Sequence, residues 1–185
     1  MKAKSLHELY VEQLKDLYDA EHQILKALPK MISEVSSEQL RSALNEHLQI
    51  TKQQAGRIER IFENIGQKVK GEKCKGMEGI IKEGNELVKK AEDEDVRDAA
   101  IIAAAQRVEH YEIAGYGTVR TYAQLLDEQE SAQLLQQTLD EEKEADQELT
   151  ALAEQINVEA GEGEVVAGAR PARATTTTTK GRRVA

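Results

Sequence analysis

Two glutamates, Glu109 and Glu112, interrupt the apolar face of a helix-length segment, residues 101–126. Steps of three and four residues keep side chains on one side of a helix, so Glu112 shares its face with Val108 and Val119. Glu109 lies one turn earlier on nearly the same face, and the two carboxylates can converge on one point. Because burying an unpaired carboxylate costs several kcal/mol or leaves it protonated, this spacing indicates a partner: a cation, a metal ion or a shared proton.

Three further predicted helices carry polar side chains at the middle of their apolar faces. Glu21 occupies such a position in the first, His47 in the second, and Glu142 and Asp146 in the last. Helical bundles use inward-pointing carboxylates and imidazoles of this kind to hold two metal ions. The candidate metal ligands are therefore Glu21, His47, Glu109, Glu112, Glu142 and Asp146.

A second interpretation is that each buried glutamate forms an ion pair with a snorkelling Lys or Arg. For any single glutamate, an ion pair explains the buried carboxylate as well as a metal ion does. For the whole set of candidate ligands it is a poor explanation, because the four apolar faces offer no Lys or Arg at the level of these residues. His47 could also be a core histidine with ordinary hydrogen bonds. His22 and His110 each follow a candidate glutamate by one residue, roughly 100° around the helix, and are expected at the surface or behind the ligands.

The donor types favour Fe or Mn as the metal. Carboxylates are hard, flexible bridging donors, and they tolerate the changing coordination that reaction with dioxygen or peroxide demands. No thiolate accompanies them, which disfavours structural zinc. Tyr18 and Tyr111 flank the carboxylates, and core packing is their expected role, with a role as redox partners as the alternative.

The composition is that of an all-helical protein. Only 3% of the residues are aromatic, Trp is absent, and there are only two Pro among 185 residues, while the chain is rich in strong helix formers. Ser5 and Glu8 form a capping-box pattern at the start of the first helix, which Pro29 is expected to kink or fray near its end. The predicted long helices are 5–34, 38–65, 95–127 and 130–157. The connection between the second and third contains a short amphipathic segment, 77–89, and is long enough to return the chain parallel to the second helix.

The sequence predicts one helical-bundle domain, residues 1–158, followed by a disordered tail, residues 159–185, rich in Ala, Gly, Thr and Arg. Five basic and no acidic residues lie in 165–185, so removing their charge from the net of −9 leaves the rest at about −14. An acidic bundle disfavours nucleic acid as its partner, because phosphate contacts need clustered Lys and Arg. The basic tail could contact nucleic acid weakly, or serve only to keep the protein soluble.

Neither secretion nor membrane insertion is signalled. Residues 1–14 contain no apolar signal-peptide core, and no later segment is an uninterrupted apolar span of membrane length. Cys74 is the only cysteine, so no internal disulfide can form, which fits a reducing compartment. The cytoplasm is the expected location.

Several stretches carry a family resemblance: LYDAEHQILKAL, EHLQITKQQAGRIERIFE, KCKGMEGIIKEGNELV, RDAAIIAAAQRVEHYEIAGYGT and LDEEKEADQELT. Together they resemble the YciE/YciF group of ferritin-like, stress-associated bacterial proteins. The match covers about residues 5–157, and VEHYEIAGYGT is its most distinctive part.

The resemblance implies a ferritin-like four-helix bundle, a homodimer, and a dinuclear metal centre related to that of rubrerythrins. It carries the ligand roles over to Glu21, to Glu109 and Glu112 within VEHYE, to Glu142 and Asp146 within EEKEAD, and to His47 at the head of the second-helix motif. The chain departs from the pattern at HLQIT, where relatives often read HLEET, so Gln49 and Ile50 replace carboxylates. The Glu-x-x-His pair of typical di-iron bundles is also missing, and one of the two metal positions could be weak or empty.

Two functions from different classes remain open on the sequence alone. The first is a redox-active di-metal protein that consumes peroxide or oxidises ferrous iron under stress. The second is a non-enzymatic dimeric bundle with a structural or interaction role, in which the acidic centre binds metal only for stability or not at all. Iron storage in a mineral cage is a weaker third option.

Overall fold

Five α-helices, and no strand, make up the part of the chain that the computed structural model describes, residues 3–168. The helices are α1 (Leu6–Glu34), α2 (Glu38–Asn64), α3 (Lys75–Lys90), α4 (Glu94–Leu125) and α5 (Gln129–Gly168). The first four begin where a side chain accepts hydrogen bonds from the free N–H groups of the first turn. These caps are Ser5, Ser37, Cys74 and Asp93. At the end of α2, Gly66 adopts a positive φ of 66°, which a residue without Cβ reaches most easily.

The predicted helix bounds agree with α1 to α4 to within two residues, and α1 continues past Pro29 to Glu34. The end of α5 differs, because the helix runs to Gly168 and not to the predicted end near residue 157. The predicted start of the tail, residue 159, therefore lies inside α5. Residues 169–185, the rest of the predicted tail, lie outside the described residues.

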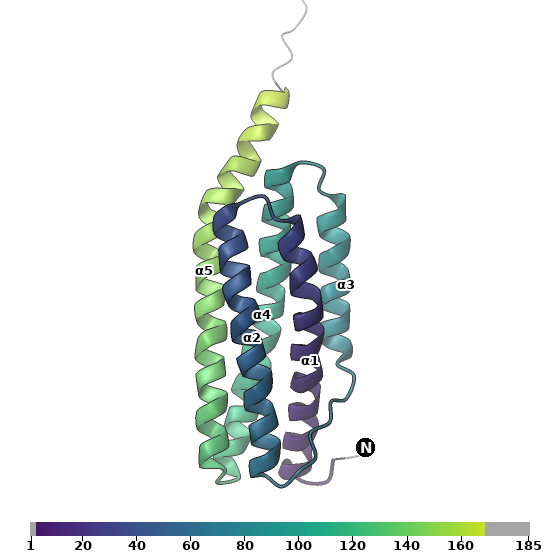
Figure 1. Cartoon of the computed structure of the whole chain (residues 1–185), viewed down its shortest axis with the longest axis vertical. Helices are drawn as coiled ribbons and strands as arrows, with labels where there is room; N and C mark the ends of the chain where they lie inside the picture. The colour runs from purple at the N-terminus through teal and green to yellow at the C-terminus, as the bar shows by residue number, and fades with distance from the viewer. Residues whose placement is uncertain (1–2, 169–185) are drawn as a thin grey trace, which may run out of the picture.

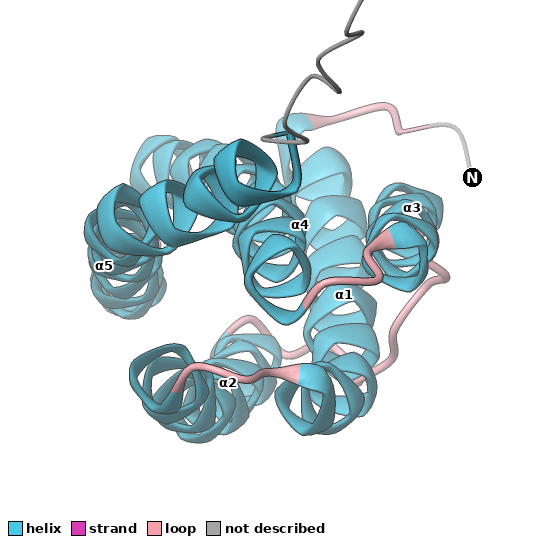
Figure 2. Cartoon of the chain, turned by 90° about the horizontal axis from the view of Figure 1, so that it is seen from above, coloured by secondary structure: helices cyan, strands magenta, loops and turns pink. Residues whose placement is uncertain are grey.

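Four of the helices form a bundle in which each contacts two neighbours: α1 packs on α2 and α4, and α5 packs on the same two helices. Figure 1 shows α2 and α4 running in the same direction, as the predicted crossover requires, with α3 rising along the outside. The view along the bundle in Figure 2 places α3 beside α1 and α4, which are the helices it contacts. The loop after α2 and α3 itself thus together carry the chain back along the length of the bundle, and α3 covers one of its faces.

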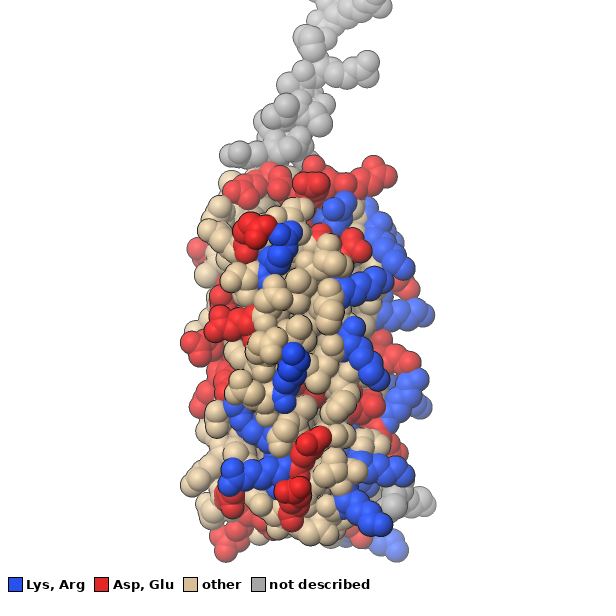
Figure 3. Space-filling model, viewed as in Figure 1, with Lys and Arg blue, Asp and Glu red and all other residues tan. Residues whose placement is uncertain are grey.

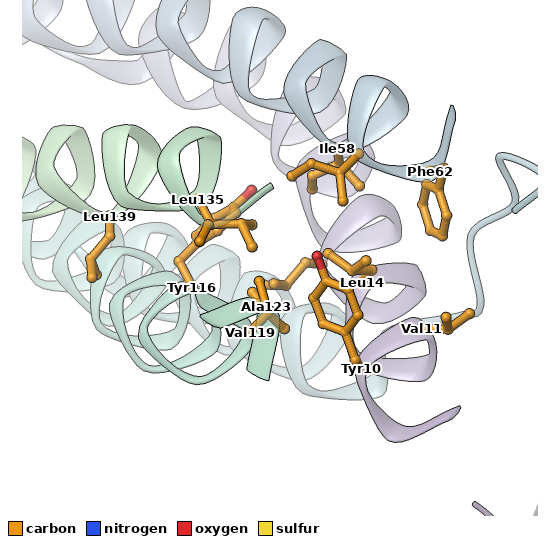
Figure 4. Close-up of a cluster of buried hydrophobic side chains, with 13 residues drawn as sticks. Tyr10, Val11, Leu14, Ile58, Phe62, Tyr116, Val119, Ala123, Leu135 and Leu139 are labelled. Carbon is orange, nitrogen blue, oxygen red and sulfur yellow. The ribbon is translucent and has the colours of Figure 1, made fainter. Parts of the chain in front are cut away.

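The apolar core is divided into two clusters by a polar layer at mid-length. One cluster contains Tyr10, Leu14, Phe62 and Val119 (Figure 4). The other lies toward the opposite end and contains residues such as Ile24, Leu44 and Ile101. Between them lie the buried polar side chains Glu21, His47, Thr51, Gln54, Glu109, Glu112 and Glu142. No helix among the described residues combines the length and the apolar character needed to cross a membrane.

The packing of α3 on α4 depends on Gly84. A Cβ added there would lie 2.9 Å from the Cβ of Ala104, closer than two carbon atoms can pack. We expect Gly84→Ala to push the helices apart and to lower the free energy of unfolding by roughly 1–3 kcal/mol. A Cβ added at Gly79 on the same helix would meet no atom of another element within 4 Å, so Gly79→Ala is the matched control. It should raise stability by up to ~1 kcal/mol through helix propensity.

Urea denaturation of both variants checks this prediction. Opposite signs of the change in stability are expected. A Gly84→Ala protein as stable as Gly79→Ala would contradict the close approach of α3 to α4.

Candidate metal centre

Four of the predicted ligands meet at the centre of the bundle. His47 of α2, Glu109 and Glu112 of α4, and Glu142 of α5 each offer one ligand atom, and these atoms all lie within 4.8 Å of one another. We call these four residues the central cluster. Each is at most 8% exposed. The three-residue spacing on α4 places two carboxylates one turn apart, as the sequence predicts.

Glu21 of α1 lies against this cluster. Its side chain is fully buried, and its carboxyl group is close enough to that of Glu112 to share a hydrogen bond. The hydroxyl of Tyr116 donates a hydrogen bond to Glu21 Oε1. Glu21 is therefore oriented by α4 and adds a fourth carboxylate to the site.

Asp146 is not part of the central cluster. Its Oδ1 lies 3.2 Å from Nε2 of Gln106 and 3.3 Å from Nε2 of His110, and its side chain is 21% exposed. It therefore lies at the edge of the α4–α5 interface, one turn beyond Glu142. His110 is 70% exposed, which places it at the surface as predicted. His22 faces away from the cluster, with Nδ1 2.8 Å from the carbonyl oxygen of Tyr18.

The buried polar atoms of the site lack partners within the described residues. These atoms are Glu21 Oε2, both ring nitrogens of His47, Glu109 Oε2, Glu112 Oε1 and both carboxylate oxygens of Glu142. Leaving such groups unsatisfied in a protein interior costs roughly 1–3 kcal/mol each, and more when they are charged. A divalent cation would satisfy several of them at once. Carboxylate oxygens with one imidazole nitrogen are a donor set that suits Fe or Mn, so the residues present fit such an ion.

Comparison with known proteins assigns the chain to a family. Residues 5–161 match the family described as "Domain of unknown function (DUF892)". The chain belongs to the DUF892 family. Protein YciF of Escherichia coli (strain K12) is 46% identical over 154 residues, which cover 83% of this chain and 93% of that protein. The predicted YciE/YciF resemblance is thereby confirmed.

Solved structures agree with this assignment. The E. coli stress protein YciF matches with a TM-score of 0.80 and 44% identity, covering 83% of this chain and 98% of that one. YcfI of Rhodopseudomonas palustris, a proposed structural protein, matches with a TM-score of 0.78 and 41% identity, covering 80% and 94%. A protein of Xanthomonas campestris pv. campestris shares the fold, with a TM-score of 0.69 at 24% identity, covering 86% and 98%. The predicted fold, an all-α ferritin-like bundle with a long crossover, is confirmed.

The protonation states in this DUF892 protein follow from burial. Desolvation by burial, together with charge repulsion from Glu142, raises the pKa of both Glu109 and Glu112 well above the ordinary value. Desolvation likewise raises the pKa of Glu21 well above its usual range and that of Glu142 to about 7. It lowers the pKa of His47 to about 4, so the imidazole is neutral at pH 7 and free to bind a metal. Metal binding would displace protons from these carboxyl groups.

One cation lies close to the site, although it does not pair with a predicted ligand. Arg57 of α2 is only 12% exposed, and it forms a bidentate ion pair with Glu141, at 2.5 Å and 2.7 Å. Its Nη1 also donates to Thr138. Because Glu141 takes up this guanidinium, the neighbouring Glu142 is left without an ion-pair partner among the described residues.

Two residues outside the predicted ligand set belong to the site. Tyr116 contacts Glu21, and Gln54 is buried beside Glu142 with its Oε1 unpartnered. Tyr116 follows Glu112 by four residues, a spacing from which its position could have been found. The two tyrosines predicted to flank the carboxylates bond elsewhere.

Those two tyrosines hold other elements together. Tyr18 donates to Glu59 of α2 over 2.8 Å. Tyr111 donates to Asp16 over 2.6 Å, and its hydroxyl lies 3.0 Å from Sγ of Cys74. Tyr111 therefore ties the start of α3 to α1 and α4, which is a structural role.

Proposed function

We propose that this DUF892 protein is a ferritin-like carboxylate protein that binds Fe or Mn in a dinuclear centre. In this proposal the protein acts in the stress response, where it reacts with peroxide or dioxygen or oxidises ferrous iron. The observation that carries the proposal is the set of buried, unpartnered donor atoms contributed by four helices. The similarity to the E. coli stress protein YciF supports the physiological setting. A cytoplasmic location and a homodimer stay predictions from the sequence.

In this proposal His47, Glu109, Glu112 and Glu142 hold one ion, and Glu21 beside Glu112 supplies a carboxylate for a second. The second position is the weaker one, because Ile50 offers no donor where relatives often have a carboxylate. A bound Fe or Mn ion would supply the one-electron chemistry that protein side chains lack. The chain's own part is to exclude water with the apolar clusters on both sides of the polar layer, and to orient Glu21 through the Tyr116 hydroxyl. Glu142, with a pKa of about 7, can hold or release a proton near neutral pH.

Metal-dependent stability tests the binding half of the proposal. A ligand that binds only the folded state, at a concentration a hundred times its Kd, adds about 2.7 kcal/mol to the free energy of unfolding. Each kcal/mol raises the Tm of a domain of this size by about 2–4 °C. We therefore expect the chelator-treated protein to melt at a lower temperature than the same protein with Fe(II) or Mn(II). Mg(II) is the control, since it prefers to keep its water ligands. A Tm unchanged up to millimolar Fe(II) or Mn(II) would count decisively against the site.

A second candidate function is a non-enzymatic bundle with a structural or interaction role. The description of the R. palustris relative YcfI as a proposed structural protein favours it. The two functions differ in turnover: the first requires the metal-loaded protein to consume peroxide or oxidise added ferrous iron, and the second does not. A metal-dependent rise in Tm without either reaction would support the structural role.

A further inference from the structure

A groove between α2 and α5 opens directly above the metal centre. It encloses about 140 Å³, with His47, Ile50 and Ala145 among its lining residues. A smaller hollow of about 20 Å³ shares His47 and Ala145 with the groove and reaches Glu109 of the central cluster. The two hollows share lining residues and therefore lie side by side, and the smaller one reaches the carboxylate of Glu109.

The rim of this groove is acidic. Glu46 of α2 and Glu144 and Glu148 of α5 line it, and all three side chains are exposed. Among the described residues none of the three takes part in an ion pair, and no Lys or Arg lines the groove. Lys and Arg gather instead over α3, on the other side of the bundle (Figure 3). A concave surface lined by one sign of charge concentrates ions of the opposite sign, so the groove attracts cations.

A buried, unpartnered side chain connects this acidic rim to the site. His47 is 8% exposed, neither of its ring nitrogens has a hydrogen-bond partner, and it lines both hollows. Its Nε2 lies 3.5 Å from Oε1 of Glu109. A cation that passes the rim therefore meets the imidazole first and the carboxylates next.

The opposite approach to the centre is unsuitable for an ion. The hollow beneath α3 is lined by apolar side chains such as Ile24, Leu28 and Val108, with His47 and Glu109 as its polar members. A hydrated cation would have to shed water there without compensating ligands, which is costly. Of the two approaches, only the α2–α5 groove offers oxygen donors along the way.

We propose that the α2–α5 groove is the route by which a divalent cation reaches the central cluster, with Glu46, Glu144 and Glu148 capturing the ion and His47 passing it inward. This inference rests on the proposed function, because it presupposes that the cluster binds metal. It adds a direction of uptake and a role for three surface carboxylates.

The test compares two triple variants with the same change in charge. One is Glu46→Gln/Glu144→Gln/Glu148→Gln. The control is Glu63→Gln/Glu83→Gln/Glu86→Gln, three exposed glutamates away from the groove with no ion pair among the described residues. The chelator-treated full chain of each is mixed rapidly with Co(II), whose visible absorption reports protein coordination, at low and at high ionic strength.

We expect the groove variant to bind Co(II) about ten-fold more slowly than the control at low ionic strength, with the difference shrinking at high salt, because steering is screened. The final absorbance at saturating Co(II) should be the same in both. Equal rates with normal final absorbance would overturn the uptake route and leave the proposed metal site intact. No absorbance in the wild-type protein would overturn both.

Discussion

The metal-free protein should become more stable at pH 7 when Glu112 is replaced by glutamine, by about 1.4 kcal/mol for each pH unit by which the pKa of Glu112 is raised. Desolvation by burial, together with charge repulsion from Glu142 and Glu21, raises the pKa of Glu112 well above its ordinary value of 4.5. Such a carboxyl group must take up a proton when the chain folds, which costs about 1.4 kcal/mol for each pH unit above the ordinary pKa. Glutamine keeps the shape and needs no proton, so the cost disappears.

The sign of this change separates two descriptions of Glu112. If the residue were half of a buried ion pair, the same substitution would strand its cation and destabilise the protein by roughly 3–5 kcal/mol. Glu112 is in no ion pair among the described residues, and its Oε1 has no partner at all. Stabilisation is therefore the expected result.

Metal binding should change in the opposite direction. Because Glu112→Gln removes a negatively charged donor from the central cluster, the rise in Tm produced by Mn(II) should shrink, and so should any reaction with peroxide. Urea denaturation in chelator and melting curves in Mn(II) measure the two effects. Glu83→Gln, an exposed change on α3, should alter neither. Loss of stability in chelator together with an unchanged response to Mn(II) would falsify the di-metal interpretation.

The helices could be predicted because their signals are local. Apolar spacing fixes the buried faces, and Ser5, Ser37 and Gly66 are start and stop signals that need no tertiary contact. The end of α5 could not be found in this way. The segment 159–168 has no apolar period and contains three glycines, so single-sequence propensity favours a break where the structure continues the helix.

The ligands that lie within a regular apolar face could be predicted from helical periodicity. Glu109, Glu112 and Glu142 point inward because they replace apolar residues in a regular face. The same spacing does not say how a residue at the flank of that face is oriented. Asp146 is one turn from Glu142, yet it pairs with Gln106 and His110 at the α4–α5 edge.

Contacts between helices could not be predicted from the sequence. Arg57 meets Glu141 because α2 and α5 pack in one particular register, and that register is a property of the assembled bundle. Tyr116 looks like an ordinary core aromatic until α1 brings Glu21 to its hydroxyl. The missing information in each case is the relative position of two helices.

The free energy of unfolding of the metal-free protein should fall as the pH is raised from 6.5 to 8.5. His47 has the opposite effect, and only at lower pH. Its pKa is lowered from 6.5 to about 4, so the stability that depends on the neutral imidazole is lost as the pH falls from 6.5 to about 4. The carboxyl groups have raised pKa values, so their contribution to the free energy of unfolding is complete below pH 4.5 and is lost as the pH rises. Glu142 loses it through about pH 7, and Glu21, Glu109 and Glu112 lose it as the pH rises through their own raised pKa values. Each group still protonated contributes a slope of about 1.4 kcal/mol per pH unit.

With Mn(II) bound this fall should disappear, because ligands bind metal in their deprotonated form, and above pH 6.5 neither the metal-bound folded chain nor the unfolded chain holds protons at these carboxyl groups. Urea denaturation at pH 5.5, 6.5, 7.5 and 8.5, in chelator and in Mn(II), should therefore give two stability curves that diverge above pH 6.5. The Glu112→Gln protein in chelator is the internal control: its slope should be smaller than that of the wild type by up to the contribution of one proton, about 1.4 kcal/mol per pH unit. Parallel curves for the two conditions would mean that the buried carboxyl groups do not exchange their protons for a metal ion, and the central cluster would then be only a protonated, structural part of the core.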